Sequence, residues 1–188
     1  LAAAGCRGVR IGVESGNERL RQEILKKRMS NAEILAAARL AERHGLQVYT
    51  CNMIGVPGET PAMIDETIEL NRALQPADLQ FSVFYPYPMT ELDQVCEREG
   101  YLQPGAALPS YYGRQSVLRL PTLSAEELAA GYERFAALRS ELALKRQRPG
   151  RSRLRRWALR LAGGDRARLE RWLAPWRALR RRARGRAL

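Results

Sequence analysis

The sequence predicts an α/β fold with parallel strands, and three observations support this fold class. Short runs of apolar and β-branched residues cover 9–14, 47–54 and 79–85. Helical patterns lie between them, and strands that alternate with helices at this spacing form parallel βαβ units. The first two runs each end in a polar turn marked by glycine, at 14–16 and 55–60. Because the carboxyl ends of parallel strands meet at one edge of a sheet, we expect both turns to face one pocket.

The pattern predicts two helices between the first two strands. Asn17 is placed to cap a helix that runs through Leu20 and Leu25. The second helix has stronger signals, because residues 30–33 read Ser-Asn-Ala-Glu, which is a capping box, and Gly45 follows its last turn. Its apolar face is formed by Ile34, Leu35, Ala38 and Ala41.

Three further helices are predicted after the second strand. Residues 60–61 read Thr-Pro, a favoured helix start, and Thr90 is placed to cap a short helix that ends at Gly100. A capping box at 124–127 begins a long helix. Residues 101–123 are rich in Pro, Gly and Tyr, and we expect an irregular loop, packed on the core or lying on the substrate side. The residues of the long helix that we expect to face the core are Leu128, Tyr132, Phe135, Leu138 and Leu142.

The basic composition is confined to one end of the chain. Of 32 lysines and arginines, 17 lie within 145–188, where only two acidic residues occur, so residues 1–144 are slightly acidic. The net charge of +12 therefore says nothing about the partners of the main domain. No apolar run approaches the ~20 residues of a membrane span, and the first residues lack the pattern of a signal peptide. Leu1 stands where an initiator methionine would be, and we expect a piece of a longer protein.

The three cysteines, Cys6, Cys51 and Cys96, lie far apart and without metal-ligand spacing. An odd count without a disulfide framework indicates a reducing compartment, so we expect a cytoplasmic protein. Each cysteine is expected to be a small buried apolar group.

Polar residues at the predicted strand ends favour a nucleoside site. Glu14, followed by Ser15, and Asn52 can each accept a hydrogen bond from a ribose hydroxyl, and the turn at 55–58 would bring bare backbone against a flat ring. Lys27 would reach a ligand carboxylate. Structural explanations are equally good from the residues alone: Glu14 bonded to a neighbouring N–H, Lys27 in solvent, and a plain turn before a helix cap.

These segments resemble the second half of the radical S-adenosylmethionine enzyme core, which is a partial (β/α)6 barrel. The fourth-strand pattern of that family, Glu-Ser/Thr-Gly, stands here in IGVESGNERLRQEILKK. The fifth stands as NMIGVPGETPAMIDETIELN and the sixth as PYPMTEL. All three occur in order within residues 1–100, and the match is closest to the class with a cobalamin-binding domain before the barrel. The resemblance implies the C-terminal half of a TIM-like barrel, followed by an α-helical C-terminal extension.

The resemblance also implies roles for residues at matching positions. Glu14, with Ser15 beside it, would contact the ribose of S-adenosylmethionine, and Lys27 would pair with its methionyl carboxylate. Asn52 falls near a second ribose contact. The adenine would lie against the backbone and apolar groups of Ile54, Gly55 and Val56.

Two tyrosines and one methionine complete this comparison. Tyr85 and Tyr87 fall at the mouth of the pocket, where core packing explains an aromatic ring as well as substrate contact does. Met89 replaces the usual glycine of the sixth pattern, so the resemblance does not imply the family's local backbone conformation at that turn.

The Cys-x3-Cys-x2-Cys loop that holds the [4Fe–4S] cluster of the family is absent, as is the glycine-rich motif for the methionine amino group. Both belong to the first half of the barrel, upstream of Leu1. The cluster needs three thiolates, which scattered cysteines cannot supply. We therefore expect neither metal ligands nor a catalytic residue in this chain, and no activity from it alone. The intact enzyme would use S-adenosylmethionine, the cluster and, by class, cobalamin for methyl transfer or related radical chemistry.

The predicted organisation has three parts: residues 1–90 form the barrel half, 91–144 a helical and loop extension, and 145–188 a basic amphipathic tail. One helical face of the tail carries Leu154, Trp157, Ala158 and Leu161. This pattern suits an anionic membrane surface or nucleic-acid phosphates. We rank a docked or disordered tail first, the membrane surface second and nucleic acid third.

The rival to the enzyme is a non-catalytic α/β binding module that the tail attaches to a membrane surface or to nucleic acid. Membrane binding would place the protein at the inner face of the membrane. The remaining expected partners are the upstream half of the same chain and a substrate that the sequence does not identify.

Overall fold

The structure is a computed structural model that describes residues 1–102 and 114–147. The chain divides into two compact units, Leu1–Lys145 and Arg146–Leu188. The predicted tail helices fall outside the described residues, as does the middle of the predicted loop at 101–123. The ends of that loop are described: Leu102 and Leu118 form an antiparallel bridge. None of the helices within the described part is both long and apolar enough to cross a membrane.

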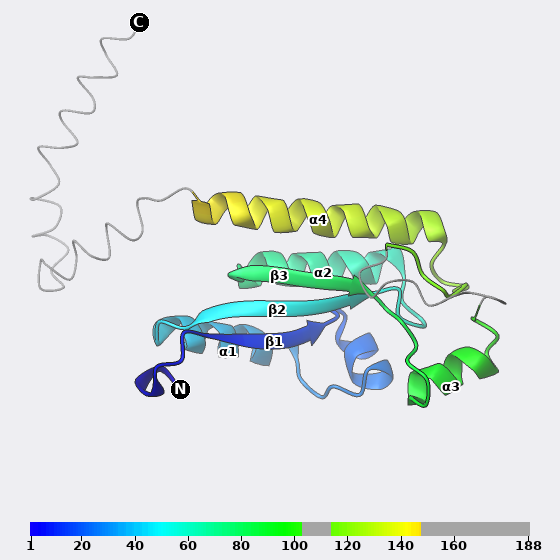
Figure 1. Cartoon of the computed structure of the whole chain (residues 1–188), viewed down its shortest axis with the longest axis horizontal. Coiled ribbons are helices and arrows are strands. Elements are labelled where there is room, and N and C mark those ends of the chain that lie inside the picture. Colours follow the sequence, from blue (N-terminus) through cyan, green and yellow to red (C-terminus); the bar gives the residue numbers. More distant parts are fainter. Residues whose placement is uncertain (103–113, 148–188) are drawn as a thin grey trace, which may run out of the picture. The chain divides into compact units, whose positions relative to one another are not determined.

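Three parallel strands form one sheet, which confirms the predicted α/β fold class (Figure 1). Their order is β1 (Gly8–Glu14), β2 (Gln47–Ile54) and β3 (Asp78–Val83). The third strand is shorter than the predicted run at 79–85. The amide of Phe84 still bonds the carbonyl of Ile54 at 2.8 Å. The ladder ends just before Pro86, which has no N–H to donate.

The described residues form four α-helices, and the predicted capping residues begin them. Ser30 and Glu33 make the expected capping box, and Thr60 and Thr90 each accept an N–H bond from the first turn of their helix. Gly5 (φ 85°) ends a short 3-10 helix, Ala2–Ala4. The α-helices are α1 (Asn31–Arg43), α2 (Pro61–Leu74), α3 (Glu91–Arg98) and α4 (Ala125–Gln147).

The helix predicted after Asn17 is present and short: Glu18 and Arg19 are α-helical, and η2 (Leu20–Ile24) continues them as a π-helical segment. Asn17 does accept a bond from the Leu20 amide, at 2.9 Å. The turn ends because Lys26 adopts a left-handed conformation (φ 56°), which reverses the chain direction. Short π-helical segments of this kind are frequent at functional sites.

Helices cover one face of the sheet. α1 and α2 pack against β1 and β2 through a core that includes Val13, Val48, Ile34, Ala38, Leu70 and Leu74. α4 runs beside β3 and α2 (Figure 1), and its Phe135 and Leu138 join the core there. Exposed ion pairs link α4 to its neighbours: Arg139 pairs with Asp78 of β3, and Arg134 pairs with Asp65 of α2.

The opposite face of the sheet, which we call the open face, carries Arg10, Gly12, Cys51, Met53 and Gln80. Arg10 donates to Gln80 at 3.0 Å, so these side chains share one side of the sheet. Strand alternation places them opposite the buried helix-facing side chains. α3 lies at the carboxyl ends of the strands (Figure 1). The functional site is therefore sought where the open face meets those ends.

Candidate functional site

Glu14 ends β1 in an unusual backbone conformation. Its φ is +64°, and the pairing of β1 with β2 shifts by one residue between Gly12 and Glu14, which is a β-bulge. Bulges commonly re-aim side chains beside active sites. The Glu14 carboxylate lies over Gly12, because a Cβ built on Gly12 would collide with Glu14 Oε1 and come within 2.7 Å of Lys27 Nζ. The carboxylate therefore stands on the open face.

Glu14 and Lys27, the two charged residues of the predicted site, form an ion pair. Lys27 Nζ lies 2.7 Å from Glu14 Oε1 and 3.2 Å from the carbonyl oxygen of Gly12. The side chain of Lys27 is 39% exposed and that of Glu14 is 16% exposed, so a ligand can reach both. An ammonium has three protons and a carboxylate two oxygens. Within the described residues, one proton of Lys27 and Glu14 Oε2 are left for a ligand.

Ser15 lies beneath this pair instead of beside it. Its side chain is fully buried, with Oγ 3.5 Å from Thr67 Oγ1 on α2, and it accepts a bond from the Asn17 amide at 3.2 Å. Gly16 donates its amide to the same Thr67 oxygen at 2.7 Å. These bonds fasten the loop after β1 to α2. The structure gives Ser15 a place in the support of the site and does not bring its hydroxyl to Glu14.

Asn52 points away from the ion pair. It is buried on the helix-covered face, where its Oδ1 accepts from Asn71 at 2.7 Å and its Nδ2 donates to the carbonyl of Gln80 at 3.1 Å. Continuing the register from Gly12–Cys51 would pair Asn52 with Val13, which takes the buried position. Glu14 is the register partner of Asn52 only because of the bulge, and its carboxylate lies on the other face, over Gly12. The predicted ribose contact of Asn52 would require the bond to Asn71 to open.

The turn after β2 presents main-chain atoms, and few side-chain atoms, to a ligand. Ile54 and Val56 are both fully buried, Ile54 in the core with α4 and Val56 in the cluster near α3. Gly55 and Gly58 take left-handed φ values of 79° and 82°. Any contact of this turn with a flat ring would therefore come from main-chain atoms, and the apolar side chains that the resemblance also implied are turned into the core.

Glu59 was missed as a site residue, although it closes this turn. Its Oε2 accepts from the amide of Gly55 at 2.5 Å and from that of Val56 at 3.4 Å. The side chain is fully buried, and Oε1 has no partner among the described residues. Burial raises the pKa of Glu59 to about 7, although the two N–H bonds oppose this shift. A carboxylate directly after Gly58 and before a helix cap was the available sequence signal.

Glu59 is expected to make stability pH-dependent. The unfolded carboxyl loses its proton near its ordinary pKa of 4.5, whereas the folded one keeps it until about pH 7, so stability is greatest below the first value and falls as pH rises through the second. A shift of this size corresponds to about 3 kcal/mol. In urea unfolding, the free energy of unfolding of the unmodified protein should fall by roughly 2 kcal/mol more than that of Glu59→Gln between about pH 5 and about pH 8. Parallel pH profiles would contradict this assignment.

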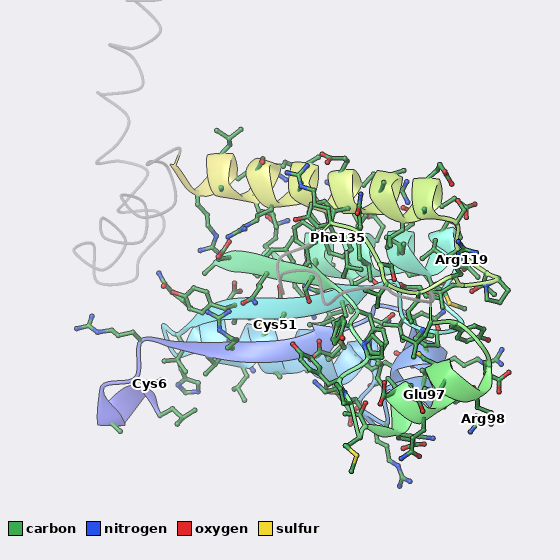
Figure 2. The ribbon with its side chains drawn as sticks, turned by 45° about the vertical axis from the view of Figure 1, so that its right-hand side comes forward. Cys6, Cys51, Glu97, Arg98, Arg119 and Phe135 are labelled. Carbon is green, nitrogen blue, oxygen red and sulfur yellow. The ribbon has the colours of Figure 1, made fainter. Side chains whose placement is uncertain are left out.

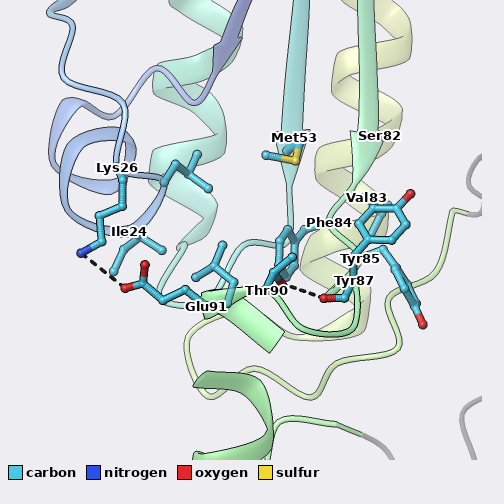
Figure 3. Close-up of a pocket in the computed structure, with 12 residues that line it drawn as sticks. Ile24, Lys26, Met53, Ser82, Val83, Phe84, Tyr85, Tyr87, Thr90 and Glu91 are labelled. Atoms are coloured by element: carbon cyan, nitrogen blue, oxygen red, sulfur yellow. Dashed lines mark hydrogen bonds and ion pairs between the residues drawn. The ribbon is translucent and has the colours of Figure 1, made fainter. Parts of the chain in front are cut away.

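A pocket of about 390 Å³ lies at the carboxyl ends of β2 and β3 (Figure 3). Met53, Phe84 and the Tyr85 and Tyr87 rings, which meet edge to face with centroids 5.2 Å apart, contribute to a mostly apolar wall. An exposed pair, Lys26 and Glu91, also lines the pocket, with charged atoms 3.8 Å apart. Both tyrosines border this cavity, whereas Glu14, Lys27 and Asn52 of the predicted site do not line it.

The cysteines do not form a metal site. Cys6 Sγ bonds the carbonyl of Gly8 at 3.2 Å near the chain start, whereas Cys51 lies on the sheet (Figure 2). Cys96 is buried in α3, and burial raises the pKa of its thiol to about 11, which opposes the thiolate form that binds iron. Within residues 1–102 and 114–147, no three His, Cys, Asp or Glu side chains come together. The residues of this chain therefore do not fit an iron–sulfur cluster.

Comparisons with known proteins agree with the predicted family. Residues 1–70 match the family model described as the Radical SAM superfamily. An uncharacterized methyltransferase of Pyrococcus horikoshii is 32% identical over 92 residues, which are 49% of this chain and 20% of that protein.

A solved structure with a TM-score above 0.5 has a similar fold. The radical S-adenosylmethionine methyltransferase TsrM from Kitasatospora setae, with tryptophan and the analogue aza-SAM bound, is similar over 73% of this chain and 32% of its own, with a TM-score of 0.55 and 22% identity. A second structure of TsrM, with cobalamin and a [4Fe–4S] cluster bound, has a TM-score of 0.48 and 24% identity over 69% and 26% of the two chains. This chain spans about a fifth of the Pyrococcus protein and about a third of TsrM.

Proposed function

We propose, from the premise that this chain belongs to the radical SAM superfamily through residues 1–70, that the Glu14–Lys27 edge of its sheet holds S-adenosylmethionine. The observation that carries the proposal is the pair itself. A carboxylate and an ammonium, 2.7 Å apart and both accessible, stand on the open face at the carboxyl end of a parallel strand. That edge is where ligands bind in parallel α/β folds.

The chemistry of the pair matches the two polar parts of this ligand. Lys27 would donate its remaining proton to the methionyl carboxylate, a charge-assisted bond. Glu14 Oε2 would accept from a ribose hydroxyl while Oε1 keeps its bond to Lys27. The backbone of Gly55 and Val56 would approach the adenine. Gly12 has no side chain, which leaves room for the pair above the strand.

The reaction would be a radical methyl transfer, a proposal supported by the methyltransferase names of the Pyrococcus protein and TsrM. A [4Fe–4S] cluster supplies the electron in enzymes of this family. Because the cysteines described above do not fit that cluster, its ligands would come from outside this chain, which would be inactive alone. Association with cobalamin rests on the sequence resemblance. The part of this chain is to bind and orient the nucleoside cofactor.

Binding of S-adenosylhomocysteine to the full-length natural protein tests the proposal. Equilibrium dialysis should give a dissociation constant in roughly the micromolar range, where about −8 kcal/mol is expected. Adenosine is the matched control ligand, because it keeps the ribose and base but lacks the carboxylate that would meet Lys27. It should bind about tenfold more weakly, since hydrogen bonds to charged groups contribute about 1.5–3 kcal/mol. Absence of S-adenosylhomocysteine binding, or equal affinity for adenosine, would contradict the proposal.

A further inference from the structure

Arg21 is a fully buried cation in η2. Its guanidinium makes four hydrogen bonds to three acceptors. Two go to the carbonyl of Met29, at 3.0 and 2.7 Å, one to the carbonyl of Ser15 at 2.5 Å, and one to Asn31 Oδ1 at 2.9 Å. Within the described residues these hydrogen bonds all go to neutral acceptors, and the nearby charge of Glu18 adds a favourable electrostatic interaction. Burying a cation costs free energy unless its N–H groups find hydrogen-bond acceptors.

The acceptors of Arg21 come from both ends of the loop that joins β1 to α1. Ser15 directly follows Glu14, and Met29 and Asn31 lie shortly after Lys27. Asn31 strengthens the same junction, because its Nδ2 donates to the carbonyl of Gly16 at 2.8 Å. The guanidinium therefore holds the two ends of the β1–α1 loop together.

Arg21 also holds Lys27 through the main chain. The amide of Lys27 donates to the carbonyl of Arg21 at 3.0 Å, immediately after Lys26 reverses the chain. The backbone of Lys27 is thus tied to Arg21, and the carbonyl next to Glu14 is tied to the Arg21 side chain. One residue sets the positions from which the two charged side chains meet.

We propose that Arg21 is the positioning residue of the candidate site: it fixes the loop so that Lys27 and Glu14 are held in place before a ligand arrives. This inference rests on the proposed function. Binding groups that are fixed in advance lose less conformational freedom when the ligand binds. The planar guanidinium makes four hydrogen bonds to three acceptors, more than the three donors of a lysine ammonium allow.

The test compares Arg21→Lys with Arg19→Lys in the full-length natural protein. Arg19 is the matched control, since it lies in the same loop but is exposed and, among the described residues, pairs with Glu23. Amide hydrogen exchange needs no ligand. Arg21→Lys should speed exchange at residues 14–16 and 27–31 by about tenfold or more while the amides of β2 stay protected. Uniform faster exchange, or unchanged exchange in the loop, would overturn the proposal.

A binding cycle tests whether Arg21 acts through Lys27. If it does, Arg21→Lys and Lys27→Met should each weaken S-adenosylhomocysteine binding by about tenfold, and the double variant should be no weaker than Lys27→Met. Losses that multiply would overturn the proposal. If Arg21→Lys does not fold, Asn31→Ala removes one acceptor of the guanidinium, and the same exchange pattern is expected. If the unmodified protein binds no S-adenosylhomocysteine, the proposed function fails while the exchange experiment still decides the role of Arg21.

Discussion

Replacing Gly16 with alanine is expected to lower the free energy of unfolding by about 3 kcal/mol or more. A Cβ at this position would lie 2.5 Å from Thr67 Cα and 2.6 Å from the carbonyl carbon of Glu66, and it would also collide with the Glu66 oxygen. These are backbone atoms of α2, which cannot rotate away as a side chain can. The clash would also strain the bond from the Gly16 amide to Thr67 Oγ1. Urea unfolding monitored by circular dichroism measures the loss.

Gly58→Ala is the matched control for that prediction. Gly58 also sits in a turn and has a left-handed φ of 82°, but no atom outside its neighbours lies within 4 Å of the added Cβ. Its substitution should cost only backbone strain, about 1 kcal/mol. Equal destabilisation by the two substitutions would contradict the prediction that the close contact between the β1 loop and α2 requires a glycine at position 16.

Lys27→Met is expected to weaken S-adenosylhomocysteine binding by about tenfold, which corresponds to the lower end, about 1.5 kcal/mol, of a hydrogen bond to a charged group. Stability should change by less than about 1 kcal/mol, because the ion pair with Glu14 is partly exposed. Equilibrium dialysis and urea unfolding measure the two effects separately. Loss of binding without loss of stability would identify a ligand contact.

Two further variants sharpen the Lys27 prediction. Arg28→Met removes one positive charge from the adjacent exposed residue and should leave the affinity within about twofold, since exposed charges are well screened. Gly12→Ala keeps every charge but places a methyl group on the pair, and it should weaken binding by a similar factor as Lys27→Met. An Arg28→Met loss as large as that of Lys27→Met would mean that only the net charge of the loop matters.

Local signals explain why the fold could be predicted from the sequence. The Ser30 capping box, the Thr60 and Thr90 caps and the apolar periodicities each depend on neighbouring residues, and the structure confirms them. Parallel pairing followed from the alternation of strands and helices. The helix after Asn17 was predicted as well, but its π-helical form in η2 was not.

The arrangement of the site was harder to predict, because it depends on a single inserted residue. The bulge at Val13 makes Glu14 the register partner of Asn52, although the two side chains lie on opposite faces of the sheet. Nothing in the local pattern marks the bulge. Arg21 was overlooked for a related reason: its charge indicates solvent exposure, and its burial becomes reasonable only when the carbonyls of Ser15 and Met29 converge on it.

The ratio of two affinities tests the central claim most directly. S-adenosylhomocysteine and adenosine should be titrated against the unmodified full-length protein and against Lys27→Met. If Lys27 binds the ligand carboxylate, the unmodified protein should prefer S-adenosylhomocysteine by about tenfold, and Lys27→Met should bind the two ligands with nearly equal affinity. A preference that persists unchanged in Lys27→Met would contradict the assignment of the Glu14–Lys27 edge as the site for S-adenosylmethionine.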